Sequence, residues 1–157
     1  MDNRVIFLKE KLIPLLRSLP TTAQPQWGKM SVQQMIEHLI DTFRLASGRL
    51  ANTTLVTPPE KLEGFRQFLM SDQPFPKGLE NPLLPKDPVP VRNSTIAEAL
   101  NELQTEIDYF FTVFEENDQQ TTLHPYFGQL DFNMNIQAQY KHMLHHLAQF
   151  GVDGTTA

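Results

Sequence analysis

Apolar side chains recur at intervals of three and four residues along several stretches of this chain, the spacing expected for one buried face of an α-helix. The first stretch runs from Arg4 to Ser18, and Leu19-Pro20 ends it. Its apolar positions are Val5, Leu8, Leu12, Leu15 and Leu16. Because Pro14 lies inside the pattern, we expect this first helix to be kinked or to begin its regular part late.

A second helix is predicted after Ser31, because Ser31 and Gln34 form the capping-box pattern of a helix N-terminus. The apolar stripe of this helix consists of Val32, Met35, Ile36, Leu39, Phe43 and Ala46. Gly48 stands where a helix commonly ends on a left-handed residue. The helix carries His38.

A third helix is predicted from the capping box of Thr95 and Glu98 to about Glu116. Its apolar stripe consists of Ile96, Leu100, Leu103, Ile107, Phe110, Phe111 and Phe114. The acidic residues Glu98, Glu102, Glu106 and Asp108 are expected on the opposite side of this helix. A fourth helix is predicted to start near Asp131 or Asn133 and to end at Phe150.

Residues 51–91 separate the second helix from the third and contain most of the prolines. Residues 60–70 are predicted to form a short helix, whereas the prolines from 71 to 91 exclude a regular one. Four apolar residues indicate that this connection packs on the helices: Phe75, Leu79, Leu83 and Leu84. No strand pattern competes, so the sequence predicts one all-α domain over 1–157, a four-helix bundle with a long crossover between helices two and three.

Composition narrows the classes of function. The net charge is −5 with the acidic residues dispersed, which disfavours a nucleic-acid binder. No apolar run approaches the roughly 20 residues of a membrane span, and the N-terminus does not resemble a secretory signal. The chain has no cysteine, so a cytoplasmic location is expected and any metal site must be built from His, Asp or Glu.

Three of the five histidines lie in the fourth predicted helix, at His142, His145 and His146. His142 and His146 are four residues apart, so they project from one flank of the apolar face, one turn apart. His145 falls on the opposite side, where we expect it to face solvent. On the second helix, His38 also lies on a flank of the apolar stripe. Flank positions are where neighbouring helices of a bundle meet and where metal sites in bundles are built.

Two imidazoles fill only half of a tetrahedral shell, so a third ligand must come from elsewhere in the fold. Three histidines suit a divalent ion with open positions, with zinc, nickel, iron and manganese all chemically admissible. Residues that could orient the second nitrogen of a ligand are Glu37, Asp41, Gln139 and Gln149. The alternative is that each histidine is an ordinary hydrogen-bonded or solvated helix residue, because an H-x-x-x-H pair alone is a weak signal.

Several short motifs together are more specific than their parts. W-G-K-M at 27–30 and M-I-E-H at 35–38 resemble the start of the second helix in the DinB/YfiT-like superfamily. H-P-Y-F-G at 124–128 and K-H-M-L-H-H-L-A-Q-F-G at 141–151 resemble the closing segment of an uncharacterised branch of that superfamily, as does F-P-K-G at 75–78. The resemblance covers most of the chain, and the motifs occur in the expected order.

The resemblance implies a four-helix bundle of up-down-down-up topology and a metal held by one histidine of helix two and a pair from helix four. The matching residues are His38, His142 and His146. The family's last motif is commonly H-x-x-x-H-R-x-Q, and here Leu147 replaces the arginine while Gln149 is kept. Characterised members include transferases and isomerases that use low-molecular-weight thiols, and hydrolase-like proteins. The family also allows a homodimer.

Two further residues have alternative interpretations. His124, next to Pro125, is either a general acid–base near the site or a loop residue that shapes the turn. Trp27 is either a core residue at a helix entry or a wall of the substrate pocket, and the core is favoured.

Three hypotheses about function follow. The first is an enzyme in which a divalent metal, most simply zinc or nickel, activates water or the thiol of a small cosubstrate. A strongly anionic cosubstrate would need a cation near the site, and Arg44, Arg49 and Lys141 are the candidates. The second hypothesis is a non-catalytic bundle that binds metal or a small ligand. The third is a structural or interaction protein without metal.

Overall fold

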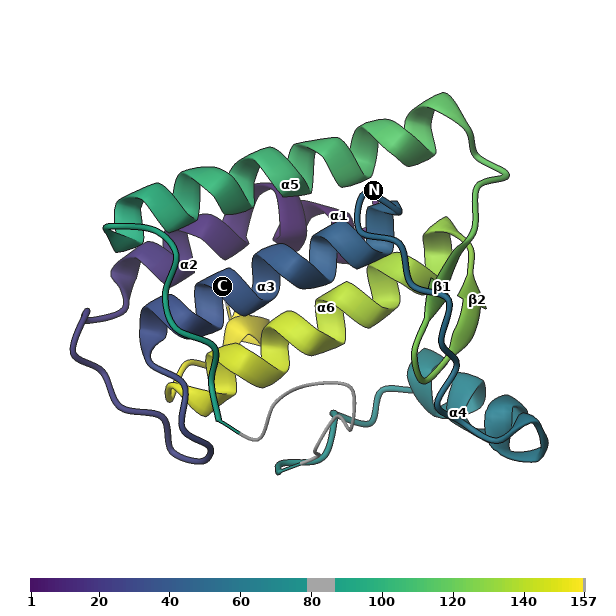
Figure 1. Ribbon diagram of the computed structural model, residues 1–157, viewed down its shortest axis with the longest axis horizontal. Helices are drawn as coiled ribbons and strands as arrows, with labels where there is room; N and C mark the ends of the chain where they lie inside the picture. The colour runs from purple at the N-terminus through teal and green to yellow at the C-terminus, as the bar shows by residue number, and fades with distance from the viewer. Residues whose placement is uncertain (79–86, 157) are drawn as a thin grey trace.

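Long helices packed side by side form the body of the protein (Figure 1). The computed structural model describes residues 1–78 and 87–156. Within them, the long helices are α3 (Val32–Ser47), α5 (Ile96–Glu116) and α6 (Phe132–Gln149). The N-terminal helical segment packs along them and completes the predicted four-helix bundle (Figure 1).

The N-terminal helix changes its winding before its proline. It consists of α1 (Asn3–Ile6), the π-helical turn η1 (Phe7–Lys11) and α2 (Leu12–Ser18). The backbone N–H of Leu12 donates to the carbonyl of Phe7, the longer step of a π-turn. Pro14, which has no backbone N–H to donate, is the third residue of α2 and follows directly after this π-turn. The regular helix thus restarts just before the proline.

The predicted caps of α3 and α5 are present. Ser31 and Gln34 form a reciprocal capping box, and Gly48 ends α3 with a φ of 82°. The Thr95 side chain accepts from the backbone N–H of Glu98. The crossover lets α3 and α5 run in the same direction while α2 and α6 run in the other, an up-down-down-up order (Figure 1).

The main core lies between the N-terminal segment, α3, α5 and α6. Phe43 of α3 and Phe110 of α5 are fully buried and meet edge to face, with ring centroids 5.6 Å apart. The apolar stripes predicted for α3 and α5 supply half of the buried residues of this core: Val32, Met35, Ile36, Leu39, Phe43, Ala46, Leu100, Leu103, Ile107, Phe110, Phe111 and Phe114. The stripes therefore face the interior as predicted.

Glu106 corrects one expectation about the polar side of α5. It is buried, whereas it was predicted to lie on the outer side with the other acidic residues. The Nε of Arg49 lies 2.6 Å from one of its carboxylate oxygens, and the Nε of Arg44 lies 3.5 Å from the other. Glu106 lies three residues after Leu103 and four before Phe110, which places it at the edge of the buried stripe. Arginines at the end of α3 and just after it cover its carboxylate.

The crossover contains the predicted short helix, α4 (Pro59–Met70), which packs on α6. Lys141 and Gln137 of α6 donate to the last carbonyls of α4: the Nζ of Lys141 lies 2.8 Å from the Phe68 oxygen, and the Nε2 of Gln137 lies 3.0 Å from the Leu69 oxygen. Phe75 packs on this region as predicted. Leu79, Leu83 and Leu84, which were also predicted to pack on the helices, lie outside the described residues.

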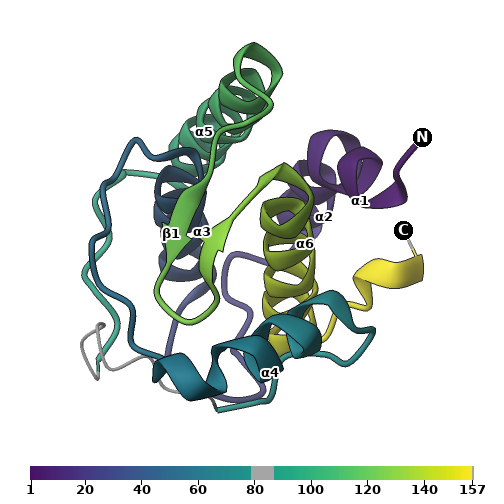
Figure 2. The same cartoon turned by 90° about the vertical axis from the view of Figure 1, so that its right-hand side faces the viewer.

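A small antiparallel hairpin corrects the prediction that no strands form. It consists of β1 (Thr122–His124) and β2 (Gly128–Leu130), with Thr122 opposite Leu130. The hairpin lies beside α3 and α6, and α4 lies at its turn (Figure 2). Three-residue strands are too short to show an alternating pattern, so their sequence resembles a loop. A single 3₁₀ turn, η2 (Gly154–Thr156), follows α6.

Candidate metal centre

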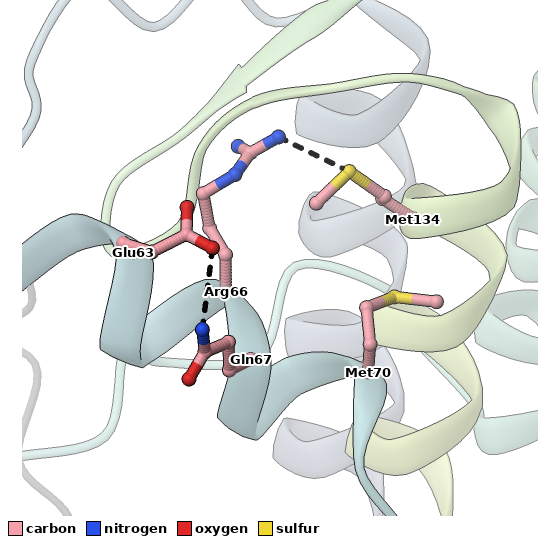
Figure 3. A pocket seen from close by; sticks show the side chains of 5 residues that line it. All are labelled: Glu63, Arg66, Gln67, Met70 and Met134. Atoms are coloured by element: carbon pink, nitrogen blue, oxygen red, sulfur yellow. Dashed lines mark hydrogen bonds between the residues drawn. The ribbon is translucent and has the colours of Figure 1, made fainter.

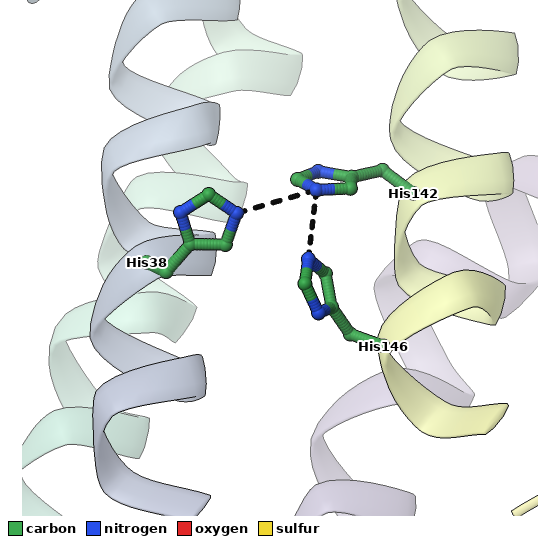
Figure 4. A group of neighbouring side chains, drawn as sticks. All are labelled: His38, His142 and His146. Carbon is green, nitrogen blue, oxygen red and sulfur yellow. Dashed lines mark hydrogen bonds between the residues drawn. The ribbon is translucent and has the colours of Figure 1, made fainter. Parts of the chain in front are cut away.

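Three histidines from two helices converge on one point between α3 and α6 (Figure 4). The Nε2 of His142 lies 2.8 Å from the Nε2 of His146 and 3.3 Å from the Nε2 of His38. Ligand atoms of all three residues lie within 4.8 Å of one another. The structure therefore brings together the three residues that the sequence selected.

The 3.3 Å between the Nε2 atoms of His38 and His142 matches two ligands of one metal ion, and the 2.8 Å between those of His142 and His146 is somewhat shorter. A tetrahedral zinc ion holds each imidazole nitrogen at about 2.0–2.1 Å, which places two such nitrogens about 3.3 Å apart. The Nε2 of His142 faces two other Nε2 atoms but can carry one hydrogen at most, so it cannot donate a separate hydrogen bond to each. A shared cation would accept all three lone pairs at once.

Gln149 fixes the tautomer of His146. Its amide nitrogen donates to the Trp27 carbonyl oxygen at 2.9 Å, so its amide oxygen must be the atom that lies 2.8 Å from the Nδ1 of His146. Because this oxygen can only accept, Nδ1 carries the hydrogen and the Nε2 of His146 keeps a free lone pair. That lone pair is the one directed at the other two histidines.

The other three candidates for orienting a ligand have different partners. The amide of Gln139 bonds to the side chain and carbonyl of Thr42. Glu37 is buried and accepts from the backbone N–H groups of residues 92 and 93. Asp41 accepts from Arg92. Among the four residues considered, the hydrogen bonds therefore single out Gln149, three residues after His146 on the same helix, a spacing that could have indicated the contact.

Burial keeps the three histidines in the form that binds metal. It lowers the pKa of His38 to about 4, while the charge of Asp41 acts weakly in the opposite direction. Burial first, and neighbouring histidines second, also lower the pKa of His142 and of His146 well below the usual value. All three rings are therefore neutral at pH 7, and no proton must leave before a metal binds.

His145 does not face solvent as predicted. It is half-buried, its ring lies 5.5 Å from that of Trp27, and a hydrogen bond joins it to the backbone of Phe75. The expectation failed because the crossover and the loop before α3 cover this side of α6. Trp27 is half-buried beneath Lys77, whose ammonium lies 4.8 Å from the indole centroid.

His124 lies at the end of β1 and shapes the turn of the hairpin. Its Nδ1 accepts from the backbone N–H groups of Tyr126 at 3.0 Å and of Phe127 at 3.4 Å. Burial lowers the pKa of His124 to about 4, so the ring is neutral at pH 7 and its hydrogen is on Nε2. Its ring lies 4.7 Å from that of Phe127.

Two phenylalanines that sequence reasoning did not assign to the site lie beside it. The ring of Phe75 lies 6.4 Å from that of His142 and stacks on Phe127 at 6.0 Å. Phe127 in turn lies 4.7 Å from the ring of His124. These residues belong to the F-P-K-G and H-P-Y-F-G motifs, which were the available signal. They form an apolar wall between the hairpin and the histidines.

The comparison with protein families agrees with this arrangement. Residues 8–150, nearly the whole chain, match the DinB superfamily. The chain belongs to the DinB superfamily. Among curated proteins, none matches it significantly.

Two surface hollows lie away from the histidines. One, of about 370 Å³, is lined by Glu63, Arg66, Gln67, Met70 and Met134 (Figure 3). Arg66 lies across it and donates to the Phe127 carbonyl at 2.8 Å, so its charge is already used to hold the hairpin. The other, of about 280 Å³, lies between the N-terminal segment and η2.

Within the described residues, no helix is both long and apolar enough to cross a bilayer.

Proposed function

We propose that this DinB protein binds a divalent metal ion through His38, His142 and His146 and acts on a small molecule at that ion. The observation that carries the proposal is the convergence of three neutral Nε2 atoms from two helices. Zinc and nickel suit an all-imidazole set best, and iron or manganese is also admissible. Three neutral ligands leave the ion its full charge, which would acidify a bound water or thiol.

An open coordination shell favours an enzyme over a purely structural site. Among the described residues, no carboxylate or fourth histidine joins the group of three. His38 and His142 keep partial exposure, while His146 is 5% exposed. A structural site would be closed by a fourth protein ligand. We therefore favour a metal-dependent transferase or hydrolase, with a non-catalytic ligand-binding or metal-binding bundle as the alternative.

The cations that the sequence offered as an anion clamp have other partners, which favours a substrate without a strong negative charge. The ammonium of Lys141 already donates to carbonyls at the end of α4. Arg44 is paired with Glu102 at 2.7 Å, and Arg49 with Glu106 at 2.6 Å. None of these three cations is placed as an anion clamp. Since the chain has no cysteine, a thiol-dependent reaction would use a small cosubstrate of low charge.

We further propose that His124 assists the reaction as a hydrogen-bond donor. Its Nδ1 is occupied by two backbone N–H groups, so only its Nε2–H is available to a substrate. With a pKa of about 4, the ring would keep this hydrogen and stay neutral at pH 7. This role differs from that of a general base, because a neutral Nε2–H group cannot accept a proton at that atom.

The test is a comparison of metal-loaded and metal-free protein. Zinc-loaded and nickel-loaded samples would be assayed for transfer of a small thiol to electrophilic acceptors and for hydrolysis of ester and amide substrates. We expect turnover that needs the metal and is lost in His38→Ala. Stoichiometric metal binding with no turnover in either assay would favour the non-catalytic alternative. Failure of zinc, nickel, iron and manganese alike to bind would refute the proposal.

A further inference from the structure

Gln149 joins the end of α6 to the loop that precedes α3. Its side chain is 4% exposed, and both ends of its amide are paired, with the Nδ1 of His146 at 2.8 Å and the Trp27 carbonyl at 2.9 Å. Its backbone carbonyl also accepts from the N–H of Gln26 at 2.8 Å. The same residue therefore touches a candidate ligand and holds the loop at two points, Gln26 and Trp27.

Gly28 makes this arrangement possible. Its φ of +76° is a conformation that side chains with a Cβ rarely adopt. A Cβ at this position would also lie 2.9 Å from the amide nitrogen of Gln149. The turn thus presents the Trp27 carbonyl and leaves room for the amide that donates to it. This accounts physically for the Trp27-Gly28 pair that the sequence singled out.

We infer that Gln149 is a positioning residue of the metal centre, which holds His146 as the Nδ1–H tautomer and directs its Nε2 lone pair at the shared point. The orientation of the amide is fixed by the Trp27 carbonyl, because a carbonyl can pair only with the amide nitrogen. The loop before α3 therefore sets the protonation pattern of a ligand on α6. This inference rests on the metal site proposed above. It adds the requirement that Gln149 hold His146 with its hydrogen on Nδ1.

Loss of this contact has a defined consequence. Without the amide oxygen, the ring of His146 can rotate, and it can place its hydrogen on Nε2, where that hydrogen blocks a metal. Removing a residue that orients a metal ligand typically weakens metal binding 10–100-fold. The alternative is that Gln149 only stabilises the loop, in which case its loss would lower stability and leave metal affinity unchanged.

The matched control is Gln139, a glutamine of the same helix that is 5% exposed and bonds to Thr42. Zinc affinity would be measured by competition with a chelator for the wild type, Gln149→Leu and Gln139→Leu. We expect Gln149→Leu to bind zinc about 10–100-fold more weakly and Gln139→Leu to stay within roughly threefold of the wild type. Equal weakening in the two variants, or none in Gln149→Leu, would overturn the inference.

A second measurement needs neither zinc nor a variant that folds. Long-range ¹H–¹⁵N correlation spectra of the metal-free wild type report which ring nitrogen of His146 carries the hydrogen. We expect Nδ1, and a hydrogen on Nε2 would overturn the inference. Failure of the wild type to bind zinc, nickel, iron or manganese would overturn the proposed function together with this inference. Tight zinc binding by both the wild type and Gln149→Leu would overturn this inference alone.

Discussion

Replacing His124 by Asn should remove an acid-sensitive group and keep the turn intact. The Nδ1 of His124 accepts two backbone N–H groups, from Tyr126 and Phe127. The side-chain oxygen of Asn occupies nearly the same position as Nδ1 and can accept the same two bonds. Unlike the imidazole, it does not gain a proton in mild acid. The substitution therefore isolates the free-energy cost of protonating one buried ring.

The magnitude follows from the pKa of His124. Burial lowers it to about 4 in the folded protein, against an ordinary value of 6.5 that applies to the unfolded chain. The unfolded chain therefore binds more protons between these values, so the stability that the neutral ring contributes is present above pH 6.5 and is lost as pH falls toward 4. Between pH 7 and pH 5, this linkage amounts to about 2 kcal/mol.

The assay is urea unfolding of the metal-free protein at pH 7 and pH 5, for the wild type and His124→Asn. The other histidines titrate in both proteins, so their contributions cancel in the difference. We expect the wild type to lose about 2 kcal/mol more of its free energy of unfolding than the variant over this range. Equal losses in the two proteins would refute the argument that His124 is a buried neutral ring.

Three other substitutions test the scaffold. Phe110→Ala removes a fully buried ring and should lower the free energy of unfolding by about 3–5 kcal/mol, measured with urea; a loss below about 1 kcal/mol would contradict the described core. Ser31→Ala removes the side-chain acceptor of the α3 capping box and should cost about 1 kcal/mol in the same assay, with no change in metal content. Lys141→Met removes the ammonium that donates to the Phe68 carbonyl and should speed amide hydrogen exchange at the end of α4 about tenfold or more; unchanged exchange there would show that this contact does not hold α4.

Features encoded within a single helix could be predicted from the sequence. The stripes of α3 and α5 and the caps at Ser31 and Thr95 depend on residues three or four positions apart. The same holds for the pair His142 and His146. These local patterns gave the helix bounds and the candidate ligands because they need no knowledge of how the helices pack.

Features that depend on contacts between distant segments could not be predicted in this way. His145 is half-buried because Trp27 and the crossover cover it, and a helical wheel contains neither. The arginines that cover the carboxylate of Glu106 come from the end of α3 and just after it. The contact of Gln149 with His146 was one of four candidates, and the distant Trp27 carbonyl decides how the amide is oriented.

Metal content tests the central claim most directly. Protein purified without a histidine tag would be analysed by elemental mass spectrometry beside the double variant His142→Ala, His146→Ala. The converging Nε2 atoms predict close to one divalent ion per chain in the wild type and loss of that ion in the variant. No metal in either protein, even after incubation with zinc, nickel and manganese, would contradict the metal centre and leave these histidines as ordinary residues of the bundle.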